Sequence, residues 1–294
     1  MSRIIAVTGA SGLIGSALVG HLRAKGDTVI KLVRREPRAK DEAFWNPMDG
    51  KVDLAALEGV TSIVHLAGAG VGDKRWSAAY KGEILNSRLY GTTTIAHAAE
   101  ELKVSSLISS SAIGWYGETG NRAVTENDRG GDDFLAAVCR EWEAAADVAT
   151  GVRTIKIRTG LVLEPTGGAL GRMLPLFRFG LGGKLGSGKQ WWSWITLHDH
   201  LRAIQFIMDK EHLSGPINLT SPNPVTNQEF TSALARALRR PALFPAPAIA
   251  LKLALGGFST EILGSKKVMP NVLQEAGFHF DYPHIGPALE ALTD

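Results

Sequence analysis

The chain opens with a glycine motif set between an apolar stretch and a helical pattern. Residues 4–7 are apolar, and residues 9–15 read Gly-Ala-Ser-Gly-Leu-Ile-Gly. The hydrophobic spacing of a helix starts inside the motif at Leu13. This order predicts a strand, a tight turn and a helix, in which Gly9 permits the turn and Gly15 permits close packing of the helix on the strand.

The same motif suits an anion. Gly12 leaves the backbone open to a pyrophosphate, and the first free N–H groups of the helix, with the helix dipole behind them, face that position. Ser11, Leu13 and Ile14 stand at this helix start and are expected to contact the ligand together with the glycines. A glycine-rich turn without a ligand is the alternative, but the strand–helix context favours a dinucleotide.

Composition narrows the classes of protein to which the chain could belong. The chain has 294 residues, 45% of them hydrophobic, and a net charge of +3, as is ordinary for a soluble globular protein. It has no long run of Lys or Arg, so we expect neither a nucleic-acid partner nor a membrane anchor. The single cysteine, Cys139, excludes an intrachain disulfide and suits the cytoplasm. The uncharged residues 4–20 contain four glycines and fit a strand and helix better than a signal peptide.

Strand and helix patterns alternate through the first half of the chain. The predicted strands are 28–33, 61–66, 104–109 and 152–157, and the predicted helices are 77–102, with a break near Gly91, and 132–149. Such alternation is typical of parallel βαβ units. We therefore predict an α/β fold with a Rossmann-type doubly wound parallel sheet in residues 1–164.

The pattern changes after residue 164. Glycines crowd residues 167–188, three tryptophans follow at 191, 192 and 194, and prolines mark residues 241–247. We predict that residues 165–294 form mainly a small mixed C-terminal substrate lobe. It is not an independent domain, has segments that return to the core, and faces the carboxyl ends of the strands.

The end of the second predicted strand bears on the choice of dinucleotide. An acid about 20 residues past the glycines favours NAD, but Arg34 and Arg35 stand nineteen and twenty residues after Gly15. Two guanidiniums suit a 2′-phosphate, so we expect NADP, with NADPH preferred over NADH. The alternative is a solvated pair of surface arginines. After the next predicted strand, the small residues of Leu66-Ala67-Gly68 let the backbone run beside the pyrophosphate and ribose.

With these pieces the whole chain resembles an extended short-chain dehydrogenase/reductase, the superfamily of sugar-nucleotide epimerases and dehydratases. The nucleotide motif, the segment 65–68, the serine-rich segment 109–117 and the segment 194–199 carry the resemblance. It places Ser111 as the catalytic serine and Ser109 beside the cofactor. Finer motifs resemble an atypical branch, the YfcH-like "epimerase family" proteins: Lys74-Arg75-Trp76, Ser87-Arg88, Phe134-Leu135-x-x-Val138-Cys139-x-x-Trp142-Glu143, Leu185-Gly186-Ser187-Gly188 and Pro222-x-Pro224-Val225-Thr226-Asn227.

The chain departs from the pattern of this superfamily in the predicted helix 132–149. The resemblance implies a tyrosine general acid/base and a lysine four residues later, on one helix face. Here Leu135 and Cys139 stand in those places, and Arg88 stands where an asparagine is usual. Leucine carries no proton, so the usual relay is absent.

Two hypotheses follow. In the first, catalysis is rebuilt from Ser111, with Tyr116 as acid/base, Arg88 as the positive charge and Cys139 as a thiol near the nicotinamide. In the second, the nucleotide is bound and no hydride moves. Each residue also has a structural alternative: a buried inert thiol for Cys139, ring packing for Tyr116, an ion pair for Arg88 and a cap for Ser111.

The substrate is expected between the strand ends and the lobe. Lys74, Arg75 and Trp76 follow a glycine-rich loop and are candidates to hold an anionic ligand. Alternation puts Trp192 and Trp194 on one strand face, where they would line the cleft or pack in the core. His198 is a further cleft candidate. It lies near Asp199 and His200, but no compact third ligand supports a metal site.

The sequence thus predicts an NADP(H)-binding atypical member of this superfamily. It is either an oxidoreductase or epimerase acting on an unknown small metabolite, or a non-catalytic NADP-binding or sensing protein. A homodimer is a further expectation, because extended members of the superfamily often pair through helices such as those at 77–102 and 132–149.

Overall fold

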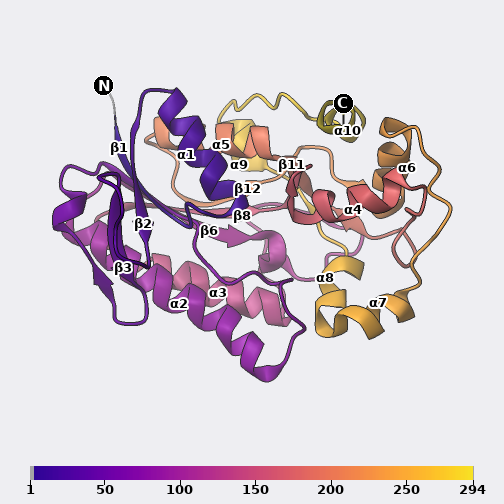
Figure 1. Ribbon diagram of the computed structural model, residues 1–294, viewed down its shortest axis with the longest axis horizontal. Helices are drawn as coiled ribbons and strands as arrows, with labels where there is room; N and C mark the ends of the chain where they lie inside the picture. The colour runs from indigo at the N-terminus through magenta and orange to yellow at the C-terminus, as the bar shows by residue number, and fades with distance from the viewer. Residues whose placement is uncertain (1–2, 294) are drawn as a thin grey trace.

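The computed structural model describes residues 3–293, and its centre is one eight-stranded sheet (Figure 1). The order across the sheet is β12-β8-β6-β5-β1-β2-β3-β4, and every neighbouring pair is parallel except β3 with β4. The strands are β1 (Ile4–Thr8), β2 (Thr28–Val33), β3 (Glu42–Asn46), β4 (Lys51–Val52), β5 (Ser62–His65), β6 (Ser106–Ala112), β8 (Arg153–Thr159) and β12 (Gly215–Leu219). Because β1 lies inside the sheet and later strands extend it on both sides, the prediction of a doubly wound Rossmann-type sheet is confirmed.

Alternating side chains give the sheet two apolar faces. Ile5 and Val7 join a cluster with helices α1 (Leu13–Ala24) and α5 (Leu197–Asp209). Ala6 points to the opposite cluster, with α2 (Ala78–Glu101), and α3 (Phe134–Ala146) packs beside α2. Figure 1 shows α1 and α5 on one side of the sheet and α2 and α3 on the other. The pairing of two copies through α2 and α3 stays a prediction.

Two parts of the core differ from the sequence prediction. Helix α2 runs without a break through Gly91, which is buried against the rings of His65 and Trp45. The glycine therefore marks a packed crossing of helix and sheet and not a helix end. The hairpin of β3 and β4, followed by the short helix η1 (Ala55–Leu57), was not predicted and forms one edge of the sheet.

The lobe is built from short elements around Trp194 and Phe230. Its two-stranded sheets pair β9 (Leu161–Glu164) with β11 (Trp194–Thr196), β10 (Trp191–Trp192) with β13 (Val225–Thr226), and β7 (Ala123–Val124) with β14 (Lys267–Val268). Its helices are α4 (Gly168–Arg178), α6 (Asn227–Ala237), α7 (Ala248–Leu255), η3 (Gly256–Phe258), α8 (Ser259–Leu263) and α10 (Ile285–Thr293). The short helix η2 (Ile113–Tyr116) lies against α3 and β8. From the second half of the chain, β12 joins the main sheet, and α5 and α9 (Asn271–Glu275) pack in the cluster on its face. Within residues 3–293 no helix combines the length and apolar character needed to cross a membrane.

Candidate functional site

The glycine turn has the geometry that its sequence requires. Gly9 has φ +66°, and Gly12 donates its backbone N–H to the Gly9 carbonyl at 2.9 Å. A Cβ on Gly15 would lie 2.1 Å from the Gly9 oxygen, so only glycine fits there. Ser11 and Gly12 are exposed, Leu13 and Ile14 are half-buried, and no side chain of residues 3–293 caps the start of α1. The first N–H groups of α1 are therefore free to bind an anion.

The loop after β5 lies directly beside this turn. Thr8 Oγ1 accepts hydrogen bonds from the N–H groups of Leu66 at 3.0 Å and Ala67 at 3.2 Å. Gly9 approaches the Leu66 carbonyl so closely that a Cβ would lie 2.9 Å from its carbon. Gly68 is exposed at the same edge. The segment 66–68 is thus fixed along the position that a pyrophosphate on α1 would occupy.

The two arginines after β2 are not equivalent. Arg35 forms two hydrogen bonds with the Glu42 carboxylate, at 2.8 and 2.7 Å, and these hold the pKa of Glu42 down at about 2. Arg34 is exposed and has no ion pair with any residue of the described chain. Glu42 thus competes with a 2′-phosphate for the charge of Arg35, whereas Arg34 has no such competitor. The binding of a 2′-phosphate by both arginines stays a prediction.

The carboxyl end of β6 contacts a buried ion pair. Ser111 donates to Glu143 Oε1 at 2.6 Å, and Glu143 is paired with Arg158 at 2.8 Å. Ser111 is 3% exposed. Ser109 is fully buried opposite His65, within the sheet, and its place beside the cofactor stays a prediction. The hydroxyl of Ser111 is held by α3 and not by a tyrosine.

Tyr116 points its hydroxyl into the protein. The hydroxyl donates to Asn218 Oδ1 at 2.7 Å and accepts from Arg158 at 3.0 Å, and the residue is 3% exposed. Burial raises the pKa of Tyr116 to about 12. The side chain fastens η2 to β8 and β12, which favours its structural alternative over the role of acid/base.

Cys139 of α3 lies at the carboxyl end of β6, and Arg88 of α2 lies at the loop after β5. The thiol of Cys139 is 3% exposed and donates to the Ala112 carbonyl at 3.7 Å. Burial, reinforced by the charge of Glu143, raises the pKa of this thiol to about 12, which favours the buried inert thiol over the reactive one. Arg88 donates to the Ala69 carbonyl at 2.9 Å, and a Cβ on Gly68 would lie 3.5 Å from its guanidinium carbon. Arg88 therefore places a positive charge directly behind the 66–68 loop.

Arg75 and Trp76 contact the lobe from the core side. Arg75 donates to the Leu253 carbonyl at 3.2 Å, and Trp76 packs against Phe258 at 6.0 Å between ring centroids. Lys74 is exposed and lies 3.4 Å from Glu83. The binding of an anionic ligand by these three residues stays a prediction.

Trp194 lies in the core of the lobe, and Trp192 packs against that core. Trp194 is fully buried and donates to the Asn223 carbonyl at 3.1 Å, so its predicted place in the cleft is wrong. Trp192 is half-buried and packs on Phe230 at 5.2 Å between ring centroids. The strand pattern is interrupted at Ser193, whose side chain bonds the backbone of Lys266 and Val268.

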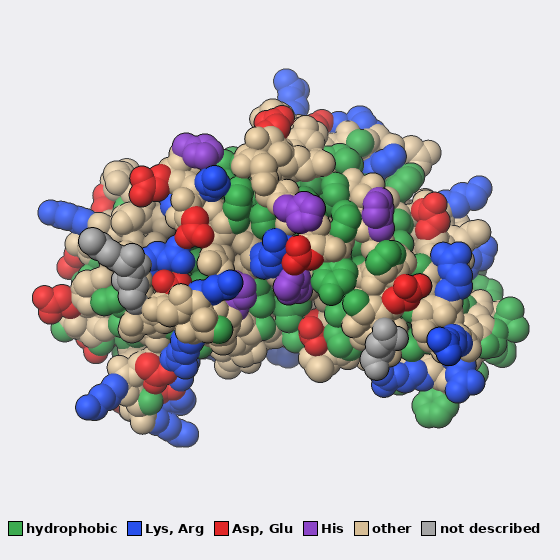
Figure 2. Space-filling model, turned by 90° about the horizontal axis from the view of Figure 1, so that it is seen from above, with side chains coloured by type: hydrophobic (Ala, Val, Ile, Leu, Met, Phe, Trp, Pro, Cys, Tyr) green, Lys and Arg blue, Asp and Glu red, His purple; other side chains and the backbone are tan. Residues whose placement is uncertain are grey.

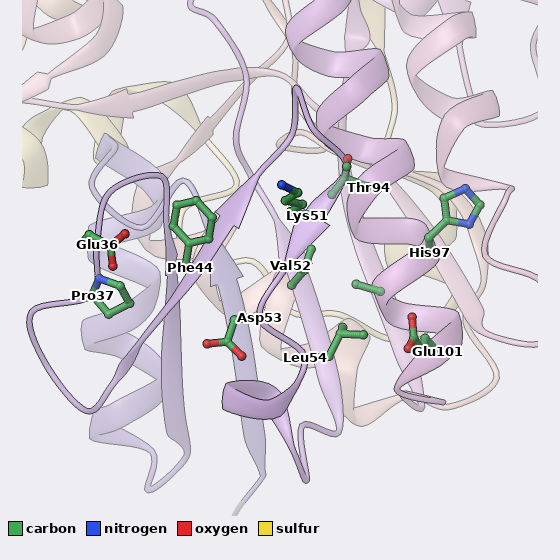
Figure 3. A pocket seen from close by; sticks show the side chains of 12 residues that line it. Glu36, Pro37, Phe44, Lys51, Val52, Asp53, Leu54, Thr94, His97 and Glu101 are labelled. Carbon is green, nitrogen blue, oxygen red and sulfur yellow. The ribbon is translucent and has the colours of Figure 1, made fainter.

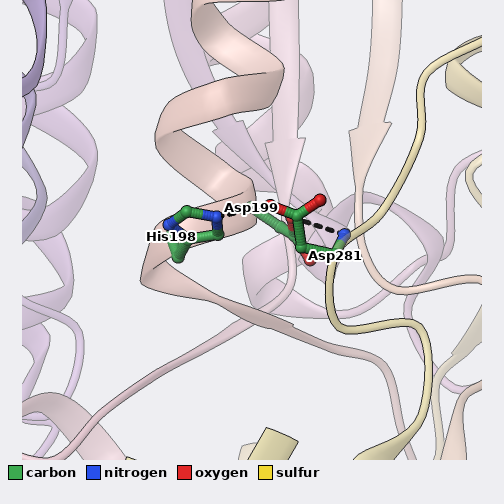
Figure 4. A group of neighbouring side chains, drawn as sticks. All are labelled: His198, Asp199 and Asp281. Carbon is green, nitrogen blue, oxygen red and sulfur yellow. Dashed lines mark hydrogen bonds and ion pairs between the residues drawn. The ribbon is translucent and has the colours of Figure 1, made fainter. Parts of the chain in front are cut away.

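His198 lies in a surface cluster with Asp199 and Asp281 (Figure 4). His198 Nε2 lies 2.7 Å from Asp281 Oδ2, and the His198 side chain is 54% exposed. Arg202 Nη1 lies 2.8 Å from Asp199 and 3.0 Å from Asp281. The cluster thus has its own cation and fastens the segment before α10 to α5. The Thr196 side chain caps α5, and Asp199 accepts the N–H groups of residues 281 and 282.

A hollow of about 580 Å³ lies at the sheet edge, where Glu36 and Pro37 are among its lining residues (Figure 3). Its walls are the β3–β4 hairpin and the C-terminal half of α2, with Phe44, Asp53 and His97 among the lining side chains. No predicted site residue lines it. We therefore place the candidate site at the carboxyl end of the sheet and not in this hollow.

Sequence reasoning missed Glu143, Arg158 and Asn218. One signal was present. Glu143 follows Leu135 and Cys139 at helical spacing on the same face of α3, whereas Arg158 continues the polar alternation of Thr154 and Lys156 in β8 and so did not stand out. Charged residues in such buried positions indicate a pair.

Comparison with known proteins agrees with this architecture. Residues 5–219 match the family model "NAD dependent epimerase/dehydratase family", and residues 246–292 match "Domain of unknown function (DUF1731)". "Epimerase family protein Mb2239" of Mycobacterium bovis is 46% identical over 99% of this chain and 97% of its own length. "Epimerase family protein SDR39U1 homolog, chloroplastic" of Arabidopsis thaliana is 38% identical over 98% of this chain and 86% of its own length. The crystal structure of human epimerase family protein SDR39U1 (isoform2) with NADPH is similar with a TM-score of 0.92 and 30% identity, covering 99% of both chains.

Proposed function

Because this chain belongs to the NAD dependent epimerase/dehydratase family, as an atypical extended short-chain dehydrogenase/reductase, we propose that it binds NADP(H) across the amino end of α1. The observation that carries this proposal is the exposed, uncapped start of α1 at Ser11 and Gly12, beside the fixed 66–68 loop. The unpaired guanidinium of Arg34 suits the 2′-phosphate that distinguishes NADP from NAD. The similar human protein was solved with NADPH, which supports the same assignment.

The proposed reaction is a hydride transfer, as in an oxidoreductase or epimerase, to or from a small metabolite. Bound NADP(H) supplies the hydride chemistry. The charge of Arg88 takes the place of the usual lysine behind the loop, and Ser111 is the hydroxyl nearest the strand end. Reduction of a carbonyl adds a hydride to carbon and a proton to oxygen. Since Tyr116 and Cys139 are buried with raised pKa values, water supplies that proton, and in the reverse oxidation water accepts it. The cytoplasm suits a chain whose cysteine is a buried free thiol.

A second candidate function is non-catalytic NADP(H) binding or sensing. The observation that favours it is the buried bonding of Ser111 and Tyr116, which commits both hydroxyls to partners inside the protein. Under this hypothesis the dinucleotide stabilises one form of the chain and no substrate is turned over.

Nucleotide titration followed by turnover assays separates these functions. NADPH should quench the tryptophan fluorescence at lower concentration than NADH, and equal or tighter binding of NADH would reject the NADP assignment. Consumption of NADPH with a panel of carbonyl metabolites, reduced by Arg88→Met and unchanged by Tyr116→Phe, would support the oxidoreductase. Tight NADPH binding without turnover of any panel member would support the sensing function.

A further inference from the structure

The outer end of the lobe carries an exposed apolar surface. We call it the lobe patch: six large hydrophobic side chains, each 53–81% exposed, Phe179, Leu181, Leu243, Phe244, Ile249 and Leu253. Helix α7, which holds two of them, has no buried residue. Of the ten large hydrophobic side chains exposed in the described part of the chain, seven come from residues 176–181 and 243–253. The exposure is therefore concentrated and not scattered.

The chain segments that carry the lobe patch are joined by backbone hydrogen bonds. Phe244 donates to the Gly182 carbonyl at 3.1 Å, and Ala246 donates to the Lys184 carbonyl at 2.9 Å. Helix α7 begins two residues later, and Arg75 holds its last turn from the core side. In Figure 1 the connection from α6 to α7 runs down the outer edge of the lobe. The lobe patch is thus formed by adjoining parts of one surface.

Basic residues predominate in the segments that carry the lobe patch. Residues 165–198 and 230–260 contain eight Lys or Arg and no Asp or Glu, with Glu164, Asp199, Glu229 and Glu261 at their borders, which leaves 24 Lys or Arg against 29 Asp or Glu for the rest of the chain. Figure 2 shows Lys and Arg side chains beside protruding hydrophobic ones at its right-hand end, the end that α6 occupies in Figure 1. The fold therefore gathers basic residues that are too far apart in the sequence to form a run.

We propose that the lobe patch docks on the surface of an anionic lipid bilayer. Apolar side chains that enter the interface, together with Lys and Arg that attract acidic headgroups, are the combination that holds a peripheral protein there. A bilayer accepts protruding side chains without a matching shape, whereas a protein partner must be complementary in shape. A symmetric pair of copies would set the same basic segments against each other.

Vesicle sedimentation tests this proposal. The protein should bind vesicles that contain phosphatidylglycerol and should bind pure phosphatidylcholine vesicles at least about tenfold more weakly, with binding that falls as salt is added. The double variant Ile249→Ser/Leu253→Ser should lose on the order of tenfold in affinity, and so should Arg240→Gln/Lys252→Gln. Met48→Ser is the matched control, because Met48 is 71% exposed but lies outside the lobe. All four positions are exposed, so the variants should keep the wild-type circular dichroism.

Three results would overturn the proposal. The first is no binding to phosphatidylglycerol vesicles at low salt. The second is vesicle binding that both double variants leave unchanged, which would place the contact elsewhere. The third is a dimer by sedimentation velocity that Ile249→Ser/Leu253→Ser converts to monomers without any vesicle binding, which would make the lobe patch an interface between copies. None of these readouts requires NADP(H).

Discussion

Glu143 and Arg158 form a two-point ion pair inside the protein. Arg158 Nε lies 2.8 Å from Glu143 Oε1, Nη2 lies 2.9 Å from Oε2, and both side chains are at most 7% exposed. The pair joins α3 to β8, and it also binds Ser111 of β6 and Tyr116 of η2. It thus stands beside the position where related enzymes have a tyrosine and a lysine, and it connects the elements that surround the candidate site.

Breaking this pair should cost far more than breaking a surface pair on the same two elements. Glu143→Gln leaves the Arg158 charge buried without a counter-charge, and we expect a loss of about 3–5 kcal/mol in the free energy of unfolding by urea. Asp147→Asn is the control, because Asp147 pairs with Lys156 across the same α3–β8 contact but is 58% exposed. Its loss should stay below about 1 kcal/mol. Equal losses for the two variants would contradict this account.

The sequence predicted those features whose cause is local. The turn at Gly9 and the packing at Gly15 follow from φ and from the space that a Cβ needs, so the motif alone predicted strand, turn and helix. Contacts between distant segments were beyond such reasoning. Glu42 reaches Arg35 only because β3 returns beside β2, and β3 was not predicted.

The direction of a side chain at the site was likewise set by distant residues. Tyr116 follows the β6 strand end, as expected, but its hydroxyl is turned inward by Asn218 of β12 and Arg158 of β8. Alternation left open whether Trp194 lines the cleft or packs in the core, and Phe230 of α6 packs with it in the lobe core. Alternation along one strand cannot say which face a later helix will cover.

Two glycines of α1 should respond oppositely to alanine. Gly15→Ala sets a Cβ against the Gly9 carbonyl, so we expect a loss of at least about 1–3 kcal/mol in unfolding free energy and weaker NADPH binding. Gly20 is exposed in the same helix, and a Cβ there meets nothing within 4 Å. Gly20→Ala should therefore stabilise by about 0.5–1 kcal/mol without changing NADPH affinity. Urea unfolding and fluorescence titration measure both quantities, and a tolerated Gly15→Ala would be inconsistent with the close approach.

Arg34 and Arg35 should differ in their effect on dinucleotide choice. Arg34→Ala removes the unpaired guanidinium, and we expect NADPH affinity to fall roughly tenfold or more while NADH affinity stays nearly unchanged. Arg35→Ala should change NADPH affinity less than about threefold, because the Arg35 charge is already paired with Glu42. Titration of both nucleotides against both variants tests this. Equal losses would support the twin-arginine hypothesis.

The thiol of Cys139 should be inert in the folded protein. Because burial raises its pKa to about 12, little thiolate is present at pH 8. We expect alkylation by iodoacetamide at least on the order of a hundredfold slower than in urea-unfolded protein, with Cys139→Ala giving no labelled product. Mass spectrometry of timed samples measures both rates. Fast labelling of the folded chain would instead support the hypothesis that Cys139 is a reactive thiol.

Stability should fall between pH 7 and pH 5 because His65 is held neutral. Burial lowers the pKa of His65 to about 3 from its ordinary 6.5, with the charge of Arg88 adding to the effect. Below pH 6.5 the unfolded chain binds a proton at this residue that the folded chain does not, so acid favours unfolding until the pH reaches the folded value near 3. His65 alone should contribute a loss of about 2 kcal/mol between pH 7 and pH 5.

The variant His65→Gln isolates this contribution. His200, whose pKa burial lowers to about 4, acts in the same direction, and Glu126, whose pKa burial raises, acts in the opposite one. Both remain in the variant, so the informative quantity is the pH 7 to pH 5 difference in urea unfolding free energy, compared between wild type and His65→Gln. The difference should shrink by about 2 kcal/mol in the variant, whatever the substitution costs at pH 7. An unchanged difference would mean that His65 is protonated in the folded protein.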